Sequence, residues 1–343
     1  MYSLVKKDIP YRGGYYKMNN KTIMVTGCLG TVGIFTINEL LKRDYYVIGV
    51  DNLSGNPYSR IHYINSNNNF LFVNNRAYDE HIDLLNKIFK DYNISAILHL
   101  AGKVGVAESF DLEKSDEYIN SNVAFTLKML NYAKLYNIKR FVYASSSSIY
   151  GNNQVPSTED LTPNPESVYG ITKYAGEMLL TQYHNLFGLE TIALRYYNIF
   201  APIKYYSYKG VVPMFAEKIM SDEPIVLFNN GQQRRQFVPI DNIVHANILA
   251  LETDNKECFG NVFNITVDDE PIALIDLVNL LYKLLNKTPN YTLKSEKSLG
   301  DIDVVWGSSD KAKNYLGYLV QKSMYDGIEE YCRYINNEMR NCG

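Results

Sequence analysis

Apolar and polar positions along the chain follow two periods, and their order predicts parallel strands separated by helices. Runs 23–25, 46–50 and 140–144 are apolar almost throughout, as is typical of strands covered on both faces. Segments 31–44 and 81–92 instead repeat apolar residues every three or four positions, which predicts helices that lay one face on a sheet. This alternation predicts an α/β fold of the Rossmann type, a doubly wound parallel sheet that binds its ligand at the carboxyl ends of the strands.

The pattern changes after about residue 200. Residues 201–215 read as a loop, short strands follow, and 242–252 and 273–287 have amphipathic helical patterns. We therefore expect a smaller, interleaved C-terminal α/β domain for the substrate. The expected organisation is an N-terminal extension (1–20), a dinucleotide-binding domain (21–200 and 237–265) and a substrate domain (201–236 and 266–343).

The segment from Lys21 to Gly33, KTIMVTGCLGTVG, reads as strand, tight turn and helix. Gly27 would allow the sharp turn, Gly30 the approach of a pyrophosphate and Gly33 the close packing of the helix. Asp51 ends the next strand, where a carboxylate can accept hydrogen bonds from an adenosine ribose and repel a 2′-phosphate. This arrangement predicts NAD binding. The alternative is that Asp51 only caps the turn that follows it.

Composition excludes several classes of protein. The 343 residues are 46% hydrophobic and 21% charged, with a formal net charge of −3, so no basic excess indicates nucleic acid. No segment has the apolar length of a membrane span or a signal peptide. The four cysteines (Cys28, Cys258, Cys332, Cys342) lack metal-ligand spacing, so we expect no metal site and a cytoplasmic location.

A candidate catalytic group lies after the strand at 140–144. Residues 145–148 are four serines at the carboxyl edge of the sheet, and Tyr169 and Lys173 share one face of a predicted helix. A tyrosine hydroxyl, with an ordinary pKa of about 10, becomes a base at neutral pH when a nearby cation stabilises its phenolate. Lys173 can be that cation, and a serine can orient the same substrate hydroxyl. The alternative is a packed tyrosine beside a solvated lysine.

These motifs together resemble the extended short-chain dehydrogenase/reductases, and among them the NAD-dependent nucleotide-sugar epimerases and dehydratases, most closely the UDP-hexose 4-epimerases. The resemblance covers about residues 21–320. It rests on TGCLGTVG, VDNLSG, HLAG, YINSNVAFT, ASSSSIYG, VYGITK, LRYYNIFAP, RRQFVPIDN and GDIDVVWGSSDKAKNYLGY.

The resemblance implies roles for individual residues. The catalytic residues would be Ser146, Tyr169 and Lys173. The residues that contact NAD would include both Tyr169 and Lys173, together with Gly27, Gly30, Thr31, Val32, Gly33, Asp51, Asn52, Leu53, Ala101, Gly102 and Asn122. The substrate, a nucleotide-diphosphate sugar, would meet Ser147, Tyr197, Asn198, Arg235 and Val305.

The chain departs from the family pattern at the substrate. Sugar 4,6-dehydratases have an acidic pair where this chain has Ser147 and Ser148, so we do not expect dehydration. Ser298 and Gly210 replace an Arg and an Asn that hold the diphosphate in galactose epimerases. Other residues, such as Lys297 or Arg234, could then hold it, or the nucleotide could sit differently.

The adenine site also departs from the pattern, because Asn75 stands where an Asp is usual. Val305 stands where a tyrosine confines related epimerases to plain hexoses, so we expect N-acetylhexosamines to fit as well. The alternative is that Val305 is an ordinary strand residue.

We therefore expect a nucleotide-sugar 4-epimerase that inverts C4 of the hexose through a transient 4-keto sugar with retained NAD. Alternatives within the fold are a reductase, a dehydrogenase or a decarboxylase, and outside enzymes an NAD-sensing binding protein. The resemblance also implies a homodimer through helices at 112–136 and 169–187, whose apolar faces could equally pack internally.

Overall fold

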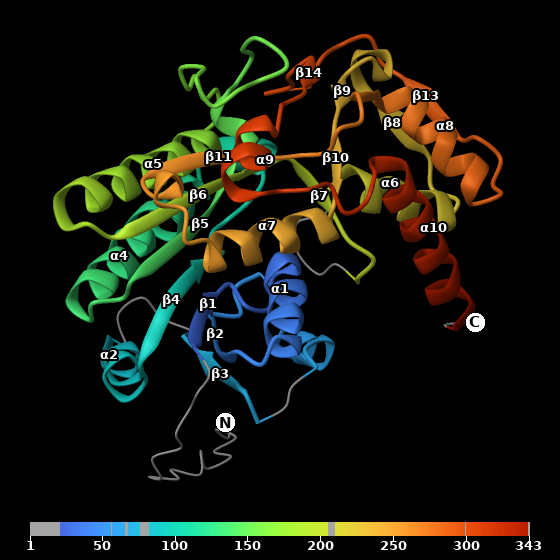
Figure 1. The fold of residues 1–343 in the computed structure, drawn as a ribbon. Coiled ribbons are helices and arrows are strands. Elements are labelled where there is room, and N and C mark those ends of the chain that lie inside the picture. Colours follow the sequence, from blue (N-terminus) through green and yellow to red (C-terminus); the bar gives the residue numbers. More distant parts are fainter. Residues whose placement is uncertain are drawn as a thin grey trace.

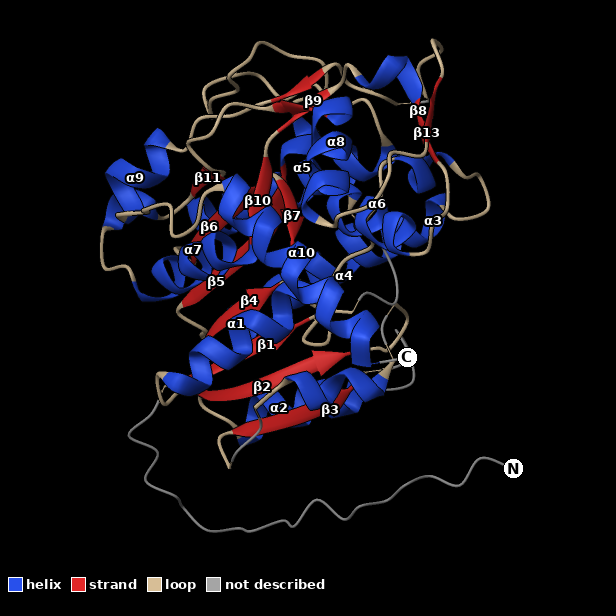
Figure 2. Ribbon diagram, turned by 90° about the vertical axis from the view of Figure 1, so that its right-hand side faces the viewer, coloured by secondary structure: helices blue, strands red, loops and turns tan. Residues whose placement is uncertain are grey.

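A seven-stranded parallel sheet forms the centre of the computed structural model, in the order β11-β6-β5-β4-β1-β2-β3 (Figures 1 and 2). The structure describes residues 21–55, 57–65, 68–75, 82–204, 210–298 and 300–341, so the predicted extension 1–20 and Cys342 lie outside the described residues. The predicted doubly wound α/β fold is confirmed. The strands are β1 (Thr22–Thr26), β2 (Tyr46–Asp51), β3 (Phe70–Asn74), β4 (Ile94–His99), β5 (Arg140–Ser146), β6 (Glu190–Tyr196) and β11 (Asn261–Ile265).

Helices cover both faces of this sheet because alternate strand residues point to opposite sides. Ile23 and Val25 of β1 belong to a core shared with α1 (Thr31–Lys42) and α7 (Ile240–Glu252). Met24, between them, belongs to a second core, which includes residues of α2 (Ile82–Asp91), α4 (Phe125–Leu135) and α5 (Val168–Phe187). The carboxyl ends of the strands are thus left as the edge where a site can form.

A second, smaller group of elements lies beside that edge (Figure 1). Its strands are short and form three separate small sheets. They are β7 (Asn198–Phe200) with β10 (Phe237–Pro239), β12 (Ile272–Ala273) with β9 (Arg234–Arg235) and β14 (Val304–Val305), and β8 (Ile225–Leu227) with β13 (Tyr291–Leu293). The remaining α-helices of the described residues are α3 (Ser115–Tyr118), α6 (Val211–Met220), α8 (Leu274–Leu284), α9 (Asp310–Leu316) and α10 (Met324–Asn341).

Two sequence-based expectations were wrong in detail. Val211–Met220 is a helix, although 201–215 was expected to be a loop. Pro213 lies in its first turn, where the missing N–H breaks no helical hydrogen bond. The helix expected from residue 112 begins at Ser115, and a π-helical turn, Ile119–Ala124, interrupts it before α4. Such turns frequently occur at functional sites.

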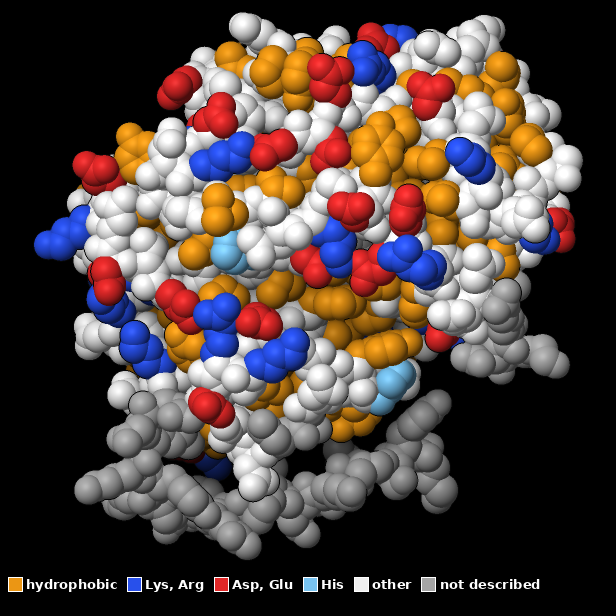
Figure 3. Space-filling model, turned by 45° about the vertical axis from the view of Figure 1, so that its right-hand side comes forward, with side chains coloured by type: hydrophobic (Ala, Val, Ile, Leu, Met, Phe, Trp, Pro, Cys, Tyr) orange, Lys and Arg blue, Asp and Glu red, His pale blue; other side chains and the backbone are white. Residues whose placement is uncertain are grey.

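The surface agrees with the near-neutral composition. On the face in Figure 3, acidic and basic side chains are interspersed with apolar ones. Among the helices of the described residues, none combines the length and the apolar character that a membrane crossing requires. Cys28, Cys258 and Cys332 are buried free thiols.

Candidate functional site

The turn between β1 and α1 is shaped to receive a phosphate group. Gly27 has a φ of +69°, and a Cβ built there would lie 2.8 Å from the Ala101 nitrogen. Gly30 is the N-cap of α1, and Thr31, Val32 and Gly33 form its first turn. The first N–H groups of a helix have no partner within the helix and carry its positive dipole. The residues present therefore fit the pyrophosphate of a dinucleotide.

Asp51, at the end of β2, faces the same turn. Its Oδ2 accepts the Leu29 N–H at 3.0 Å, and its Oδ1 accepts the Leu53 N–H at 2.9 Å. Burial raises the pKa of Asp51, while these N–H bonds and the charge of Arg60 oppose that rise. Asp51 thus caps the turn, as the alternative interpretation expected. A carboxylate has about four lone-pair sites, so capping leaves capacity for a ribose hydroxyl.

Arg60 is a residue near this site that the sequence reasoning missed. It lies in a short 3₁₀ helix, Tyr58–Tyr63, and is only 1% exposed. Its Nη2 donates to Thr31 Oγ1 at 3.5 Å, beside the N-terminus of α1. The guanidinium therefore adds a buried positive charge between the phosphate-binding turn and Asp51. An arginine in a polar loop carries no periodic signal, so only the structure reveals its burial.

The predicted catalytic pair lies on α5 at the carboxyl edge of the sheet. Ser167 caps this helix by accepting the Gly170 N–H at 3.0 Å. The helix therefore begins at Val168, with Tyr169 in its first turn and Lys173 one turn later. Lys173 is 3% exposed, and its Nζ donates to the Ala144 carbonyl at 2.8 Å. Burial lowers the pKa of Lys173 to about 8, and the charge of Glu177 opposes this shift. The solvated lysine of the alternative interpretation is therefore not what the structure contains.

The turn after β4 adjoins this pair. A Cβ built on Gly102 would lie 3.3 Å from Lys173 Nζ, so only a residue without a side chain leaves that space open. Tyr169 is half-buried, and its ring meets that of Tyr118 edge-on at a centroid distance of 6.3 Å. The predicted cofactor turn and the predicted catalytic pair are thus brought together.

The serine run ends β5 at the same edge. Ser146 Oγ accepts the Ser148 N–H at 3.2 Å and lies 3.1 Å from Ser148 Oγ. Ser147 is half-buried in the 3₁₀ turn that follows. Ser145 instead donates its hydroxyl to the buried Glu177. Only part of the run therefore faces the candidate site.

Asn122 holds the segment after Gly102 in place. It lies in the π-helical turn, is 1% exposed, and accepts the Lys103 N–H at 2.7 Å while donating to the Lys103 carbonyl at 3.0 Å. Its amide also donates to Thr172 Oγ1 at 2.9 Å, next to Lys173.

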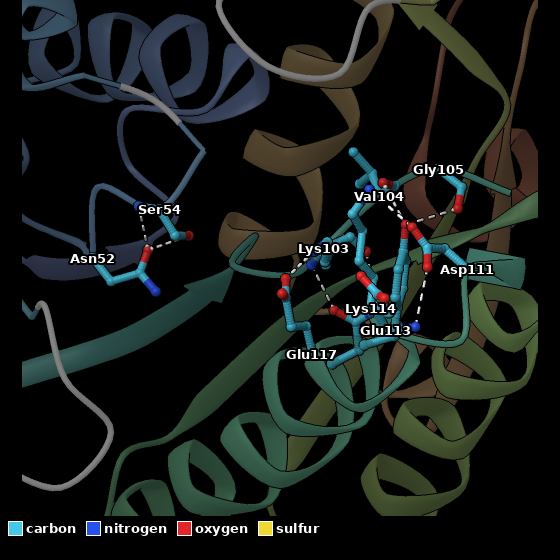
Figure 4. Close-up of polar contacts among 11 residues, drawn as sticks. Asn52, Ser54, Lys103, Val104, Gly105, Asp111, Glu113, Lys114 and Glu117 are labelled. Atoms are coloured by element: carbon cyan, nitrogen blue, oxygen red, sulfur yellow. Dashed lines mark hydrogen bonds and ion pairs between the residues drawn. The ribbon is translucent and has the colours of Figure 1, made fainter. Parts of the chain in front are cut away.

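Figure 4 shows the neighbouring contacts of this segment, which include the ion pair of Lys103 with Glu117. The Tyr118 hydroxyl donates to the carbonyls of Val104 and Gly105, at 3.1 and 3.0 Å. On the other side of the view, Asn52 Oδ1 accepts the N–H and the hydroxyl of Ser54. Hydrogen bonds therefore hold both the turn that contains Asn52 and the segment that follows Gly102.

Of the predicted substrate residues, Ser147 follows β5 of the central sheet, and the others, except Tyr197, lie in the smaller group of elements. Arg235 pairs with Val305 across β9 and β14, and its Nη2 binds Asp301 at 2.8 Å. Burial lowers the pKa of Arg235, and Asp301 opposes the shift. Asn198 donates to the carbonyl of Gln236, which follows Arg235, at 2.8 Å. Asn198, Arg235 and Val305 are therefore brought close together.

Tyr197 is the exception. It is 3% exposed, and a Cβ built on Gly307 would lie 2.0 Å from its hydroxyl. The structure thus places this side chain in the core. Arg195, two residues before Tyr197 in the same LRYY motif, forms a buried ion pair that the sequence reasoning also missed. Arg195 binds both carboxylate oxygens of Glu177, at 2.9 and 2.7 Å, beneath Lys173.

Comparisons with known proteins agree with this geometry. Residues 23–266 match the model of the NAD dependent epimerase/dehydratase family. The chain is 32% identical to the UDP-glucuronate 4-epimerase of Thermodesulfobacterium geofontis, over 92% of this chain and 94% of the relative.

Two solved structures are similar over nearly their whole length. The Bacillus cereus UDP-glucuronic acid 4-epimerase, in complex with UDP-glucuronic acid and NAD, has a TM-score of 0.83 and 30% identity, covering 92% of this chain and 99% of that one. The Thermotoga maritima UDP-glucose 4-epimerase with UDP-glucose has a TM-score of 0.80 and 30% identity, covering 93% and 99%.

Proposed function

This chain belongs to the NAD-dependent epimerase/dehydratase family, and we propose that it inverts C4 of a UDP-linked hexose or hexuronic acid. The predicted family, the use of NAD and the nucleotide-sugar 4-epimerase class are confirmed by the family match and the similar enzymes. UDP as the nucleotide, and the roles of individual residues, are the proposal.

The observation that carries the proposal is the position of Lys173. Its ammonium is buried, bonded to the Ala144 carbonyl, and separated from the cofactor turn only by the space that Gly102 leaves open. It lies one helical turn from Tyr169. A cation in this position lowers the pKa of a neighbouring phenol, because it stabilises the phenolate.

The chain's own residues then move the proton. Tyr169, as phenolate, accepts the proton of the sugar's C4 hydroxyl, while Ser146 donates a hydrogen bond that orients the same oxygen. Tyr169 returns the proton after the 4-keto sugar has presented its other face. Lys173 stays protonated through both steps and holds the charge of the phenolate. Ser147 and Ser148 carry no carboxylate, so elimination of water has no acid–base pair at these positions.

The residues of the turn before α1 and of the turns after β2 and β4 fit NAD. We assign its phosphates to the N-terminus of α1, its adenosine ribose to Asp51 with Asn52 and Leu53, and its reacting end to Ala101, Gly102 and Asn122 beside Tyr169 and Lys173. Bound NAD supplies the reversible hydride exchange with C4 that makes the inversion redox-neutral.

The smaller group of elements, apart from β7 and β10, lies in the proposed substrate domain. We assign residues 21–200 and 237–265 to the cofactor domain, and 201–236 and 266–343 to the substrate domain. Arg235 is the proposed diphosphate ligand, because its guanidinium is positioned by Asp301 and suits two phosphate oxygens. Asn198, Ser147 and Val305 complete the proposed contacts with the sugar nucleotide.

We also propose a cytoplasmic homodimer formed through α4 and α5. Both helices expose large apolar side chains, which a partner could cover: Leu127, Leu135, Met178, Leu186 and Phe187. Three buried free thiols favour a reducing compartment. Sedimentation of the wild type against Leu135→Glu and Met178→Glu tests the dimer, which is contradicted if the wild type sediments as a monomer.

The activity is tested with UDP-glucose, UDP-glucuronic acid and UDP-N-acetylglucosamine, each incubated with purified enzyme without added cofactor. We expect proton NMR to show the C4 epimer of at least one of them, and denatured protein to release NAD. No epimer with any of the three sugars contradicts the proposal. NADH accumulation in step with sugar consumption would instead indicate a dehydrogenase.

A further inference from the structure

A continuous row of buried polar groups lies beneath the turn that follows β4. The Ala101 N–H donates to Thr26 Oγ1 at 3.2 Å, and that oxygen lies 2.8 Å from His99 Nδ1. On the other side of the ring, His99 Nε2 lies 3.0 Å from Thr126 Oγ1, which donates to the Asn122 carbonyl at 2.7 Å. Thr26, His99 and Thr126 have no solvent exposure. The row therefore joins two predicted cofactor contacts, Ala101 and Asn122, through one imidazole.

The hydrogen bonds run in one direction. Thr126 gives its only hydroxyl proton to the Asn122 carbonyl, so its oxygen accepts from His99, and Nε2 must carry the hydrogen. Nδ1 is then an acceptor, which the Thr26 hydroxyl satisfies. Thr26 in turn accepts from Ala101. Every group between the two ends both donates and accepts, and only one neutral tautomer of His99 allows this.

The surroundings keep the ring neutral. Burial lowers the pKa of His99 to about 3, and the positive charge of Lys173 on α5 adds to this shift. The aromatic rings that pack around His99 are Tyr143 and Phe141 of β5 and Phe125 of α4. Burial raises the pKa of the Tyr143 phenol, so this titratable neighbour stays neutral as well.

Both ends of the row, Ala101 and Asn122, lie close to Lys173. Asn122 binds both backbone groups of Lys103 and also Thr172, the residue before Lys173. Ala101 precedes Gly102, whose open side faces Lys173 Nζ. We propose that His99, as its fixed Nε2–H tautomer, is a positioning residue that holds the Ala101–Gly102 turn and Asn122 in register around the reacting end of the cofactor.

The kinetic test uses a matched pair at Thr126, and it rests on the proposed 4-epimerase activity. Thr126→Val keeps the shape but breaks the row, whereas Thr126→Ser keeps the hydroxyl. We expect kcat to fall about tenfold or more in Thr126→Val, because small misplacements at a reacting centre are costly, and to stay within about twofold in Thr126→Ser. Thr191→Val, which removes another buried threonine hydroxyl bonded at Leu180, controls for lost stability. Equal kcat in the two Thr126 variants overturns the proposal.

The direct test needs no activity. Nitrogen-15 NMR of histidine-labelled enzyme should show His99 as the Nε2–H tautomer, unchanged between pH 5.5 and 8.5, and Thr126→Val should shift its Nε2 resonance. An Nδ1–H tautomer, or a titration near the ordinary histidine pKa of about 6.5, overturns the proposal. If no UDP-sugar is converted while this signature is found, the proposed function has failed and the fixed tautomer of His99 stands.

Discussion

The cofactor side and the substrate side of this molecule are built differently. On the cofactor side, the site residues lie at or beside the ends of the buried parallel strands, and several hydrogen bonds hold the side chains of Asp51, at the end of β2, and Asn122, in the π-helical turn. On the substrate side, Arg235 and Val305 lie on two-residue strands, and the Arg235 guanidinium is held by Asp301 and by the backbone carbonyls of Arg234 and Asp303.

This difference shows that the central sheet positions side chains more precisely than short strands and loops do. A buried strand end places its residues to within the tolerance that hydride and proton transfer require. A two-residue strand is positioned by its neighbours, so its side chains can change with the substrate that a relative binds. We expect substitutions on the cofactor side to abolish chemistry, and those on the substrate side to alter affinity or selectivity.

The largest effect should follow loss of the proton acceptor. Tyr169→Phe keeps the ring but removes the hydroxyl, so turnover should fall by about 10² or more, the usual scale of acid–base catalysis. The NAD released from denatured protein should match that of the wild type. Tyr174→Phe, on the same helix, is the matched control and should retain its activity. A Tyr169→Phe enzyme with near-normal turnover would remove Tyr169 from the mechanism.

Loss of the proposed diphosphate ligand should act on the substrate alone. Arg235→Met should raise KM for the UDP-sugar by about tenfold or more, because a charge-assisted hydrogen bond contributes about 1.5–3 kcal/mol. NAD content should not change. Arg234→Met is the control, since Arg234 is half exposed beside Glu270. A larger KM in Arg234→Met than in Arg235→Met would assign the diphosphate contact to Arg234 instead of Arg235.

Low pH should lower the free energy of unfolding, because His99 is buried as the neutral imidazole. Its pKa is about 3 in the folded protein and about 6.5 when unfolded, so the unfolded state takes up the proton first as the pH falls. Stability should therefore fall by up to about 1.4 kcal/mol per pH unit below pH 6.5 from this group. Urea unfolding of His99→Phe should show a shallower loss between pH 6.5 and 5. Parallel curves for variant and wild type would contradict a buried neutral His99.

Asp51 should make NAD bind about tenfold or more tightly than NADP, because its carboxylate repels a 2′-phosphate. The buried charge of Arg60 beside it reduces this repulsion, so we expect discrimination to disappear in Asp51→Asn. Titration of cofactor-free protein with each dinucleotide measures both affinities. Equal or tighter binding of NADP by the wild type would overturn the assignment.

The smallest effect should be a change of selectivity at Val305. Val305→Tyr should lower kcat/KM several-fold for UDP-N-acetylglucosamine and less for UDP-glucose, since the added ring meets the acetamido group and not C4. Val305→Ile is the control for added bulk without a ring. If Val305→Tyr lowers both substrates equally, the residue does not set the size limit.

The elements of the cofactor side could be predicted from the sequence because their signals are local. Glycine spacing, a strand-ending acid and the four-residue separation of Tyr169 and Lys173 each follow from one element and its neighbours. Arg60, His99 and Arg195 escaped detection because their roles depend on partners distant in the chain. Tyr197 was expected to meet the substrate from its motif alone, and nothing in the sequence around it reveals that its hydroxyl packs against the distant Gly307.

The substrate side was harder to predict from the sequence, because its local signals are weak. Ser298 and Gly210 depart from the family pattern. The strands of this region have only two or three residues, which is too short to show a periodicity. The helix at Val211–Met220 was missed because Pro213 and the preceding polar loop suggest a break, although a proline in the first turn of a helix is tolerated.

We expect inversion at C4 to be redox-neutral and to use the hydride of the sugar itself. The most direct measurement follows UDP-sugar that carries deuterium at C4, incubated in ordinary water with purified enzyme and no added cofactor. We expect the epimer to retain its deuterium at C4, and the absorbance at the NADH maximum not to rise in step with turnover. Loss of the deuterium to solvent, or one equivalent of NADH per sugar consumed, would contradict it.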